Sequence, residues 1–237
     1  MRTPARVFGA GRLVRDVIVV PRVRRSWYLR LRRPHNLFQP HNDTSLDRYP
    51  ELFRFLQEQL RDGPDVRLLS FGCSVGDEVF TLRQYFPSAS ITGIDISAGN
   101  VRACRRRQRR SRDDRMSFRQ AGSTTTEASA SYDVVLCMAV LRHGDLGAQQ
   151  APSCGHRLSF FAFEPTAADL ARCVKVGGYL VIEHSNFRFG DIKVSGAFEV
   201  VLRRPRSAAD ARGTPLYGPD NTRIDNVETL DVIFRRL

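Results

Sequence analysis

The segment Arg67–Ser97, RLLSFGCSVGDEVFTLRQYFPSASITGIDIS, has the pattern of a strand, a glycine-rich turn, a helix and a second strand. Leu68–Phe71 is a short apolar run, as buried parallel strands require. Gly72 and Gly76 permit a turn in which the backbone approaches a ligand without interference from a Cβ atom. A helix is expected over Asp77–Tyr85, directly after this turn.

The second strand is predicted over Ile91–Ile96, and Asp95 lies near its carboxyl end. Ligands of open α/β sheets bind at that edge, where a carboxylate can accept hydrogen bonds from ribose hydroxyls. The segment therefore predicts half of a nucleoside-binding site.

Two acidic residues indicate which nucleoside. A dinucleotide-binding turn needs a third glycine, with the pyrophosphate at the helix N-terminus, but this chain has Asp77 there, followed by Glu78. Carboxylates at these positions would repel a pyrophosphate and attract an ammonium or a sulfonium group. The pattern favours S-adenosylmethionine as the cofactor over NAD.

At these residues the chain resembles the class I S-adenosylmethionine-dependent methyltransferases, and among them most closely the chemotaxis receptor methyltransferases. Their Gly-Cys-Ser-x-Gly-Glu-Glu motif corresponds to Gly72–Glu78, with Asp77 as the one difference. Three further segments resemble that family's linker, fourth strand and fifth strand: Asn42–Arg48, Tyr132–Leu141 and Lys175–Asn186.

The resemblance implies that Glu78 holds the cofactor's amino group, that Asp95 holds the ribose, and that Thr44 and Arg48 close over the methionine end. The full set of expected cofactor-binding residues is Thr44, Arg48, Gly72, Cys73, Ser74, Gly76, Glu78, Asp95, Ile96, Ser123 and Cys137. In the alternative interpretation, Thr44 and Asp47 form a helix capping box and Arg48 is solvated.

The chain also departs from the chemotaxis enzymes. Where their fourth strand continues Cys-Arg-Asn, this chain has Cys137-Met138-Ala139, and Asn186 replaces a glutamate after His184-Ser185. The helical N-terminal domain and the receptor-docking insert of that family are not apparent. We therefore expect a different methyl acceptor.

The remaining pattern predicts an α/β fold with a Rossmann-like, doubly wound, seven-stranded sheet whose last strand is antiparallel, as the resemblance implies. The further strands are expected at Met116–Gln120, Tyr132–Cys137, Tyr179–Glu183, Phe198–Leu202 and Val232–Phe234. A helix is expected over 165–174, a polar link over 187–196 and a loop over 203–212. Phe160, Phe161 and Phe163 are expected in the core.

The expected domains are an arginine-rich N-terminal extension over residues 1–41 and a methyltransferase domain over residues 42–237. Residues 1–33 hold ten arginines and one acid, Asp16, interleaved with apolar residues. Such a segment can contact an acidic membrane surface or nucleic-acid phosphates. We favour a lid over the active site as its role, because the segment leads directly into residues 42–48, the expected cofactor clasp.

The net charge of +12 comes from 37 basic residues, of which only two are lysines. The run Arg105–Arg110 lies in a helix expected on the outside of the sheet. A solvated helix face is the favoured interpretation, and a nucleic-acid partner is the alternative.

Composition bears on metal binding and on the cellular compartment. The five cysteines and five histidines lack metal-ligand spacing, so no metal is expected. The sequence shows neither a membrane span nor the apolar block of a signal peptide, which predicts a cytoplasmic protein with reduced thiols.

Methyl transfer depends on in-line positioning of the acceptor, and a base is needed only for some acceptors. A carboxylate acceptor could be oriented by Arg48 or Arg142. For a hydroxyl or amine, His143 is the first candidate base and His184 the second. An aspartate for the adenine amino group is missing after the third strand, and Gln120 or Ser123 could substitute.

Three functions stay open from the sequence. The leading one is a methyltransferase for a small molecule or an exposed protein side chain, with carboxylate or oxygen acceptors suggested by analogy. The second is a nucleic-acid or ribosome-associated methyltransferase, and the third is a non-catalytic module that binds S-adenosylmethionine.

Overall fold

The computed structural model of the chain describes residues 37–39 and 44–237. It has a seven-stranded sheet with the strand order β3-β2-β1-β4-β5-β9-β6. The strands are β1 (Arg67–Phe71), β2 (Ser90–Asp95), β3 (Met116–Gln120), β4 (Tyr132–Met138), β5 (Val174–Glu183), β6 (Phe198–Pro205) and β9 (Thr229–Arg236). Strand β9 is antiparallel to both of its neighbours, and the other pairs are parallel. The predicted fold class is confirmed.

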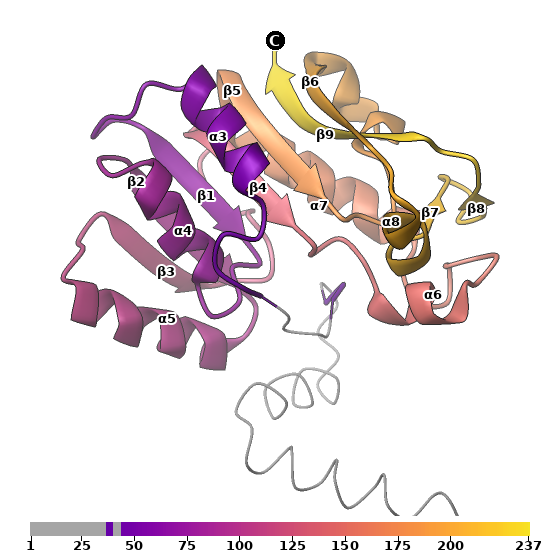
Figure 1. Cartoon of the computed structure of the whole chain (residues 1–237), viewed down its shortest axis with the longest axis horizontal. Coiled ribbons are helices and arrows are strands. Elements are labelled where there is room, and N and C mark those ends of the chain that lie inside the picture. The colour runs from indigo at the N-terminus through magenta and orange to yellow at the C-terminus, as the bar shows by residue number, and fades with distance from the viewer. Residues whose placement is uncertain (1–36, 40–43) are drawn as a thin grey trace, which may run out of the picture.

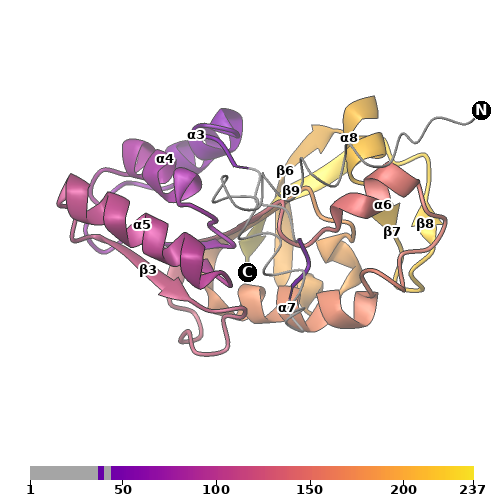
Figure 2. The ribbon, with the colours of Figure 1, turned by 90° about the horizontal axis from the view of Figure 1, so that it is seen from below.

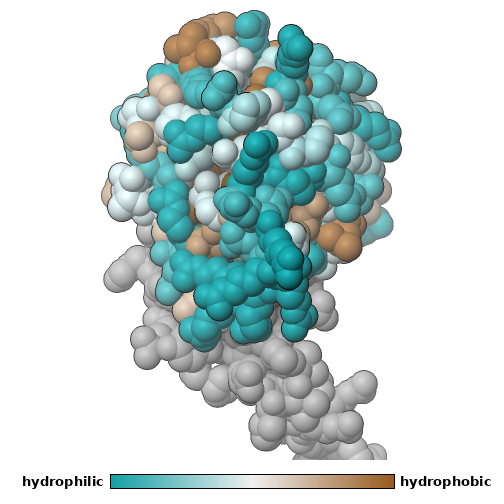
Figure 3. Space-filling view, turned by 90° about the vertical axis from the view of Figure 1, so that its left-hand side faces the viewer, coloured by the Kyte–Doolittle hydropathy of each residue, from teal (hydrophilic) through white to brown (hydrophobic). Residues whose placement is uncertain are grey.

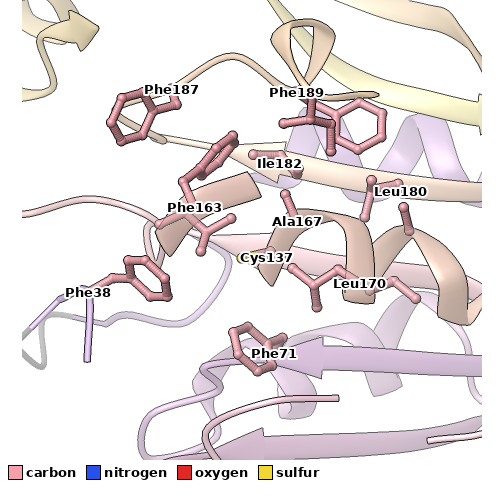
Figure 4. Packing of buried hydrophobic residues seen from close by; sticks show 14 of the residues in the cluster. Phe38, Phe71, Cys137, Phe163, Ala167, Leu170, Leu180, Ile182, Phe187 and Phe189 are labelled. Carbon is pink, nitrogen blue, oxygen red and sulfur yellow. The ribbon is translucent and has the colours of Figure 1, made fainter. Parts of the chain in front are cut away.

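Helices cover both faces of this sheet (Figures 1 and 2). One face carries α3 (Pro50–Gln59), α4 (Asp77–Tyr85) and α5 (Ala98–Ser111). The other face carries α7 (Phe160–Cys173). Two hydrophobic clusters fill the two interlayer spaces, and Figure 4 shows one of them, from Phe71 at one end to Phe187 and Phe189 at the other.

The helices after the first two strands begin where their local sequence dictates. Gly76 has a left-handed backbone (φ 92°) and is the residue before α4. The Ser97 side chain caps α5 by accepting a hydrogen bond from the backbone N–H of Asn100. The bounds of α4 and β3 are those predicted from the sequence.

Helix α7 begins earlier than predicted. The expected start was Pro165, but the helix starts at Phe160, where Ser159 caps it through the backbone N–H of Ala162. Phe163 packs against Phe187, with ring centroids 5.1 Å apart, and this contact fixes the first turn despite the proline. Among the three phenylalanines expected in the core, Phe161 is the exception, since it is 87% exposed.

The segment expected as a loop over 203–212 is also different. Its first three residues extend β6, and α8 (Ala208–Gly213) follows. A capping box between Ser207 and Asp210 starts this helix. The polar link over 187–196 contains two 3-10 turns, η1 (Phe189–Asp191) and η2 (Lys193–Ala197).

Three short elements complete the fold beside α8. They are α6 (Gly144–Gln149) and the two-stranded sheet of β7 (Leu216–Tyr217) and β8 (Arg223–Ile224). In Figure 2 they lie together at one end of the molecule, on the side away from α5.

The expected N-terminal extension lies largely outside the described residues, and so does the start of the clasp at Asn42 and Asp43. Phe38 is described and is 5% exposed in the same cluster as Phe71. The lid role of residues 1–41 stays a prediction. Within 37–39 and 44–237, no helix is long and apolar enough to cross a bilayer.

Candidate active site

A cavity lies at the carboxyl ends of β1, β2 and β4, where the sheet topology predicts a ligand. Eight of the residues expected to bind the cofactor line it: Thr44, Arg48, Gly72, Cys73, Ser74, Glu78, Asp95 and Ile96. These eight residues come from three stretches of the chain, 44–48, 72–78 and 95–96, which therefore meet around one space.

The turn after β1 is held by the neighbouring strand. The backbone N–H of Gly72 donates to the Ile94 carbonyl at 2.7 Å, and that of Cys73 donates to the same oxygen at 3.0 Å. Gly72 has a φ of 75°, and a Cβ atom there would overlap the side chain of Val140. Only glycine allows β1 to turn this tightly beneath the loop after β4.

Asp95 is buried at the end of β2 and accepts hydrogen bonds from three of the described residues. Its Oδ2 accepts from the Ser74 backbone at 2.8 Å. Its Oδ1 accepts from the Ser97 backbone at 2.8 Å and from the Asn100 amide at 3.0 Å. The carboxylate is therefore positioned by protein donors at the wall of the cavity.

Glu78 lies in the first turn of α4, is half-buried and lines the cavity. Its Oε1 has no hydrogen-bond partner in the described part of the chain. Burial raises the pKa of Glu78 to about 7, although the Ser70 hydroxyl and the Arg48 charge oppose the shift. A buried, unpartnered carboxylate oxygen fits a ligand that carries an ammonium group.

The capping-box alternative for Thr44 and Asp47 is wrong. Helix α3 begins at Pro50, with Tyr49 at its N-cap and no side-chain cap hydrogen bond. The Asp47 backbone donates to the Thr81 hydroxyl at 3.0 Å, which attaches this segment to α4. Thr44 and Arg48 are thereby held at the cavity mouth.

Three expected cofactor residues do not line the cavity: Gly76, Ser123 and Cys137. Gly76 serves the start of α4, since a Cβ atom there would lie 3.1 Å from Cys104 Sγ. Cys137 is 1% exposed in the core beneath the site.

The adenine-binding candidates after β3 are also placed differently from expectation. Ser123 bonds to the Thr125 hydroxyl at 2.9 Å. Gln120 donates to the Ile96 carbonyl at 3.4 Å. Ala121 and Gly122 line the cavity instead, so this loop contributes no polar side chain to the cavity lining.

The two candidate bases have different surroundings. His143 caps α6, because its Nδ1 accepts from the Asp145 backbone at 3.3 Å. His184 follows β5 and lines a second cavity. Its ring centroid is 5.7 Å from that of Tyr49, which lines the first cavity. Neither histidine lines the first cavity, but the His184 ring contacts Tyr49, which does.

Tyr49 is a site residue that the sequence comparison missed. It is 9% exposed, and its hydroxyl is buried without a hydrogen-bond partner among the described residues. Burial raises the pKa of this phenol well above its ordinary range, so it stays protonated. A tyrosine before a proline that opens a helix, next to the clasp residue Arg48, was the available sequence signal.

Four of the nine non-glycine residues with a left-handed backbone in the described part of the chain line the two cavities. Asp47, Ser74, Ala139 and His184 have φ values of 47°, 51°, 58° and 51°. Such conformations are uncommon for residues other than glycine and persist where the surrounding structure fixes them. This backbone strain coincides with the loops that form the site.

Comparison with known proteins agrees with this geometry. Residues 69–180, from β1 into β5, match the family model of a methyltransferase domain. An uncharacterized protein of Synechococcus sp., syc1184_c, is 33% identical over 97 residues, which are 40% of this chain and 23% of that protein. The chain thus matches less than a quarter of this curated relative's length.

Solved structures with a similar arrangement include geranyl diphosphate C-methyltransferase from Streptomyces coelicolor A3(2), with 21% identity, a TM-score of 0.41, and coverage of 56% of this chain and 44% of that chain. Phosphoethanolamine N-methyltransferase 2 of Haemonchus contortus has 16% identity, a TM-score of 0.43, and coverage of 60% and 29%. The [4+2]-cyclase SpnF has 18% identity, a TM-score of 0.47, and coverage of 69% and 60%.

The family model covers the turn after β1, the acidic end of β2 and the β4–β5 pair that border the cavity. The strand order of the sheet and the matched model lead to the same assignment. Residues 69–180 of this chain are therefore similar to a methyltransferase domain, and they lie within a sheet of Rossmann-like strand order.

Proposed function

We propose that the protein is an S-adenosylmethionine-dependent methyltransferase that acts on a small molecule or an exposed side chain. The observation that carries this proposal is Glu78 Oε1, which has no hydrogen-bond partner among residues 37–39 and 44–237, and Glu78 lines the same cavity as Asp95. An ammonium group and a ribose are the two parts of this cofactor that such carboxylates bind.

The residues present fit the cofactor. Glu78 would hold the ammonium group, Asp95 the ribose hydroxyls, and Arg48 the carboxylate of the methionine end. Ala121 and Gly122 would face the adenine. When bound, S-adenosylmethionine supplies a methyl group on a positively charged sulfur, which leaves as a neutral thioether. The similarity to the chemotaxis receptor methyltransferases supports these roles and does not extend to the acceptor.

The direct test is calorimetric titration with S-adenosylmethionine, S-adenosylhomocysteine and NAD. We expect both sulfur nucleosides to bind and NAD not to bind. Glu78→Gln should weaken binding of both by about 1–3 kcal/mol, because a charge-assisted contact is lost.

Glu58→Gln is the matched control, since Glu58 is exposed on α3 and outside the cavity. This variant should bind like the wild type. If neither sulfur nucleoside binds the wild-type protein, the assignment of the cofactor fails.

A second candidate function, methylation of a nucleic acid, is favoured by α5. Arg102, Arg106, Arg109 and Arg110 are exposed on this helix, and its first turn has no acidic residue. The molecular side on which α5 lies is mainly hydrophilic (Figure 3). The four arginines lie about one and two helical turns apart, so that they could contact several phosphates together.

Salt dependence separates this candidate from the first. RNA binding through these arginines should weaken steeply as the salt concentration rises, and replacing Arg102, Arg106 and Arg110 with glutamine should reduce the slope by up to about three ions. Indifference to RNA at low salt would remove this candidate and leave the cofactor assignment untouched.

A further inference from the structure

The second cavity lies next to the cofactor cavity, and one aromatic pair forms the boundary between them. It is bordered by the end of β5, the segment that follows, α8 and the start of β9. Tyr49 belongs to the lining of the first cavity and His184 to that of the second. Their ring centroids are 5.7 Å apart, at an interplanar angle of 47°.

One part of the second cavity is lined by apolar side chains, and polar or charged residues, among them Arg188, Arg203 and Asp231, make up the rest of its lining. Ile182, Phe187, Phe189, Val232 and Phe234 line it and are all buried. In Figure 4, Ile182, Phe187 and Phe189 lie on the same side of α7. A surface of this kind accommodates the hydrocarbon or aromatic body of a small ligand.

The lining residue that contacts Tyr49 is His184, which lies in an ion network. His184 Nδ1 lies 3.6 Å from both Glu183 Oε1 and Asp210 Oδ1. These two carboxylates are joined by Arg204, whose Nη1 lies 2.8 Å from Asp210 Oδ2 and whose Nε lies 3.1 Å from Glu183 Oε2. The ion network holds the imidazole and places its Nδ1 opposite two carboxylates.

This arrangement favours one tautomer of His184. With carboxylate oxygens on the Nδ1 side, a proton on Nδ1 is stabilised and the Nε2 lone pair is left as the proton acceptor. Burial lowers the pKa of His184, against the pull of Glu183 and Asp210 and with the help of Arg204 and Arg142. The imidazole therefore stays neutral, and able to accept a proton, below the usual pH range of histidine.

Tyr49 complements this base. A buried hydroxyl without a partner is costly and rare, so its presence at the wall of a cavity indicates a ligand atom that bonds to it. Because the phenol stays protonated, it orients that atom and does not remove its proton. The imidazole beside it is the group that can.

We propose that Tyr49 and His184 form the methyl-acceptor site, and that the acceptor is a hydroxyl or amine on an apolar body that occupies the second cavity. This inference rests on the proposed function. A lone pair of the acceptor oxygen or nitrogen forms the new bond to the methyl carbon. The carbon–sulfur bond breaks with its electron pair going to sulfur, and the acceptor's proton passes to His184. A carboxylate acceptor has no proton to lose and would need neither group.

The test uses three probes with a common phenyl body: 4-ethylphenol, 2-phenylethylamine and 3-phenylpropanoate. Each is titrated into the full-length protein saturated with S-adenosylhomocysteine, and binding is followed by saturation-transfer NMR. We expect the phenol and the amine to bind and the carboxylate to bind at least tenfold more weakly. Binding of the carboxylate as tight as the others, or of no probe at all, would overturn the proposal.

Two variants separate the roles. Tyr49→Phe keeps the ring contact and should weaken 4-ethylphenol binding about tenfold, more than it changes S-adenosylhomocysteine affinity. His184→Gln should retain probe binding but reduce methyl transfer from S-adenosylmethionine to 4-ethylphenol at least a hundredfold. The fall of the wild-type transfer rate at acidic pH should be absent in this variant. Unchanged probe binding in Tyr49→Phe, or unchanged transfer in His184→Gln, would exclude the assigned role.

The controls are Tyr179→Phe and His156→Gln, whose side chains line neither cavity. Both should behave like the wild type. If the wild-type protein does not bind S-adenosylhomocysteine, the proposed function is refuted. If the wild-type protein binds S-adenosylhomocysteine but binds the carboxylate as tightly as the phenol and the amine, or binds no probe, only the acceptor site is refuted.

Discussion

The backbone N–H of Ser74 donates to Oδ2 of Asp95 at 2.8 Å, and this hydrogen bond joins the turn after β1 to the end of β2. The acidic residue of the motif thus has two functions. It shapes the glycine-rich turn through protein donors, and it stands at the cavity wall where the ribose is expected. Variants at this position must be tested for stability as well as for binding.

Asp95→Ala should lower the free energy of unfolding by about 2–4 kcal/mol, because the donors of Ser74, Ser97 and Asn100 lose a buried acceptor. It should also weaken S-adenosylmethionine binding by about 1–3 kcal/mol. Denaturant unfolding and calorimetry measure the two effects. Asn100→Ala separates them, since Asn100 does not line the cavity and its loss should cost stability with little change in affinity. Wild-type affinity in Asp95→Ala would contradict the site assignment.

Binding of S-adenosylmethionine should depend on pH through Glu78. Its pKa is raised to about 7, whereas an ammonium ligand binds only the ionised carboxylate. Affinity should therefore increase between about pH 5.5 and 7, by up to about tenfold per pH unit, and level off above that range. Calorimetry in buffers of different ionisation enthalpy should detect proton release at pH 6 but not at pH 8. Glu78→Gln should remove both effects, and a pH-independent wild type would argue against the ammonium contact.

The same group affects stability in the opposite direction. The folded state retains a proton on Glu78 up to about pH 7, whereas the unfolded chain loses it near its ordinary pKa of 4.5. The folded state binds more protons in this window, so the contribution of Glu78 to the free energy of unfolding falls as the pH rises from 4.5 to 7. Comparison of Glu78→Gln with the wild type across this range should show the difference shrinking at low pH.

The sequence was sufficient for the first half of the fold because local pattern and burial agree there. Strands β1, β2 and β4 are short apolar runs buried on both faces, and the glycine turn at Gly72 and Gly76 can be made by few other residues. In the second half local patterns compete with packing. Pro165 suggested a helix start, but the Ser159 cap and the Phe163 contact place the start earlier.

The acceptor site could not be predicted because it is a tertiary feature. Tyr49 and His184 are far apart in the sequence, and their proximity follows from the position of α3 above the ends of β4 and β5 (Figure 1). His143 was the better candidate from the sequence alone, since it follows the fourth strand. Its ring nitrogen instead caps α6, which a sequence pattern does not reveal.

Gly72→Ala should be destabilising because the new methyl group meets Val140 and the backbone is left-handed. We expect a loss of about 1–3 kcal/mol in the free energy of unfolding. Val140→Ala removes the obstructing side chain, so the double variant should lose less than the sum of the two single variants. A double-mutant cycle by denaturant unfolding measures this coupling. Strict additivity would show that the turn relaxes without touching Val140.

Arg204→Met should destabilise the fold and change the titration of His184. It leaves the buried Glu183 and the adjacent Asp210 without their shared partner, which should cost about 3–5 kcal/mol. Removal of this positive charge should also raise the pKa of His184, which then faces two uncompensated carboxylates and Arg142. NMR titration, with the His184 signal assigned by its loss in His184→Gln, measures the shift.

The neighbouring Arg203 provides the control for this experiment. Its side chain is 64% exposed, and its ion pair with Asp231 is open to solvent. Arg203→Met should therefore change stability by no more than about 1 kcal/mol and leave the pKa of His184 unaltered. If the two variants behave alike, the ion network around Glu183 does not set the protonation state of His184. Burial would then account for the lowered pKa of His184 without a contribution from Arg204, and the part assigned to Arg204 in keeping the imidazole neutral would be excluded.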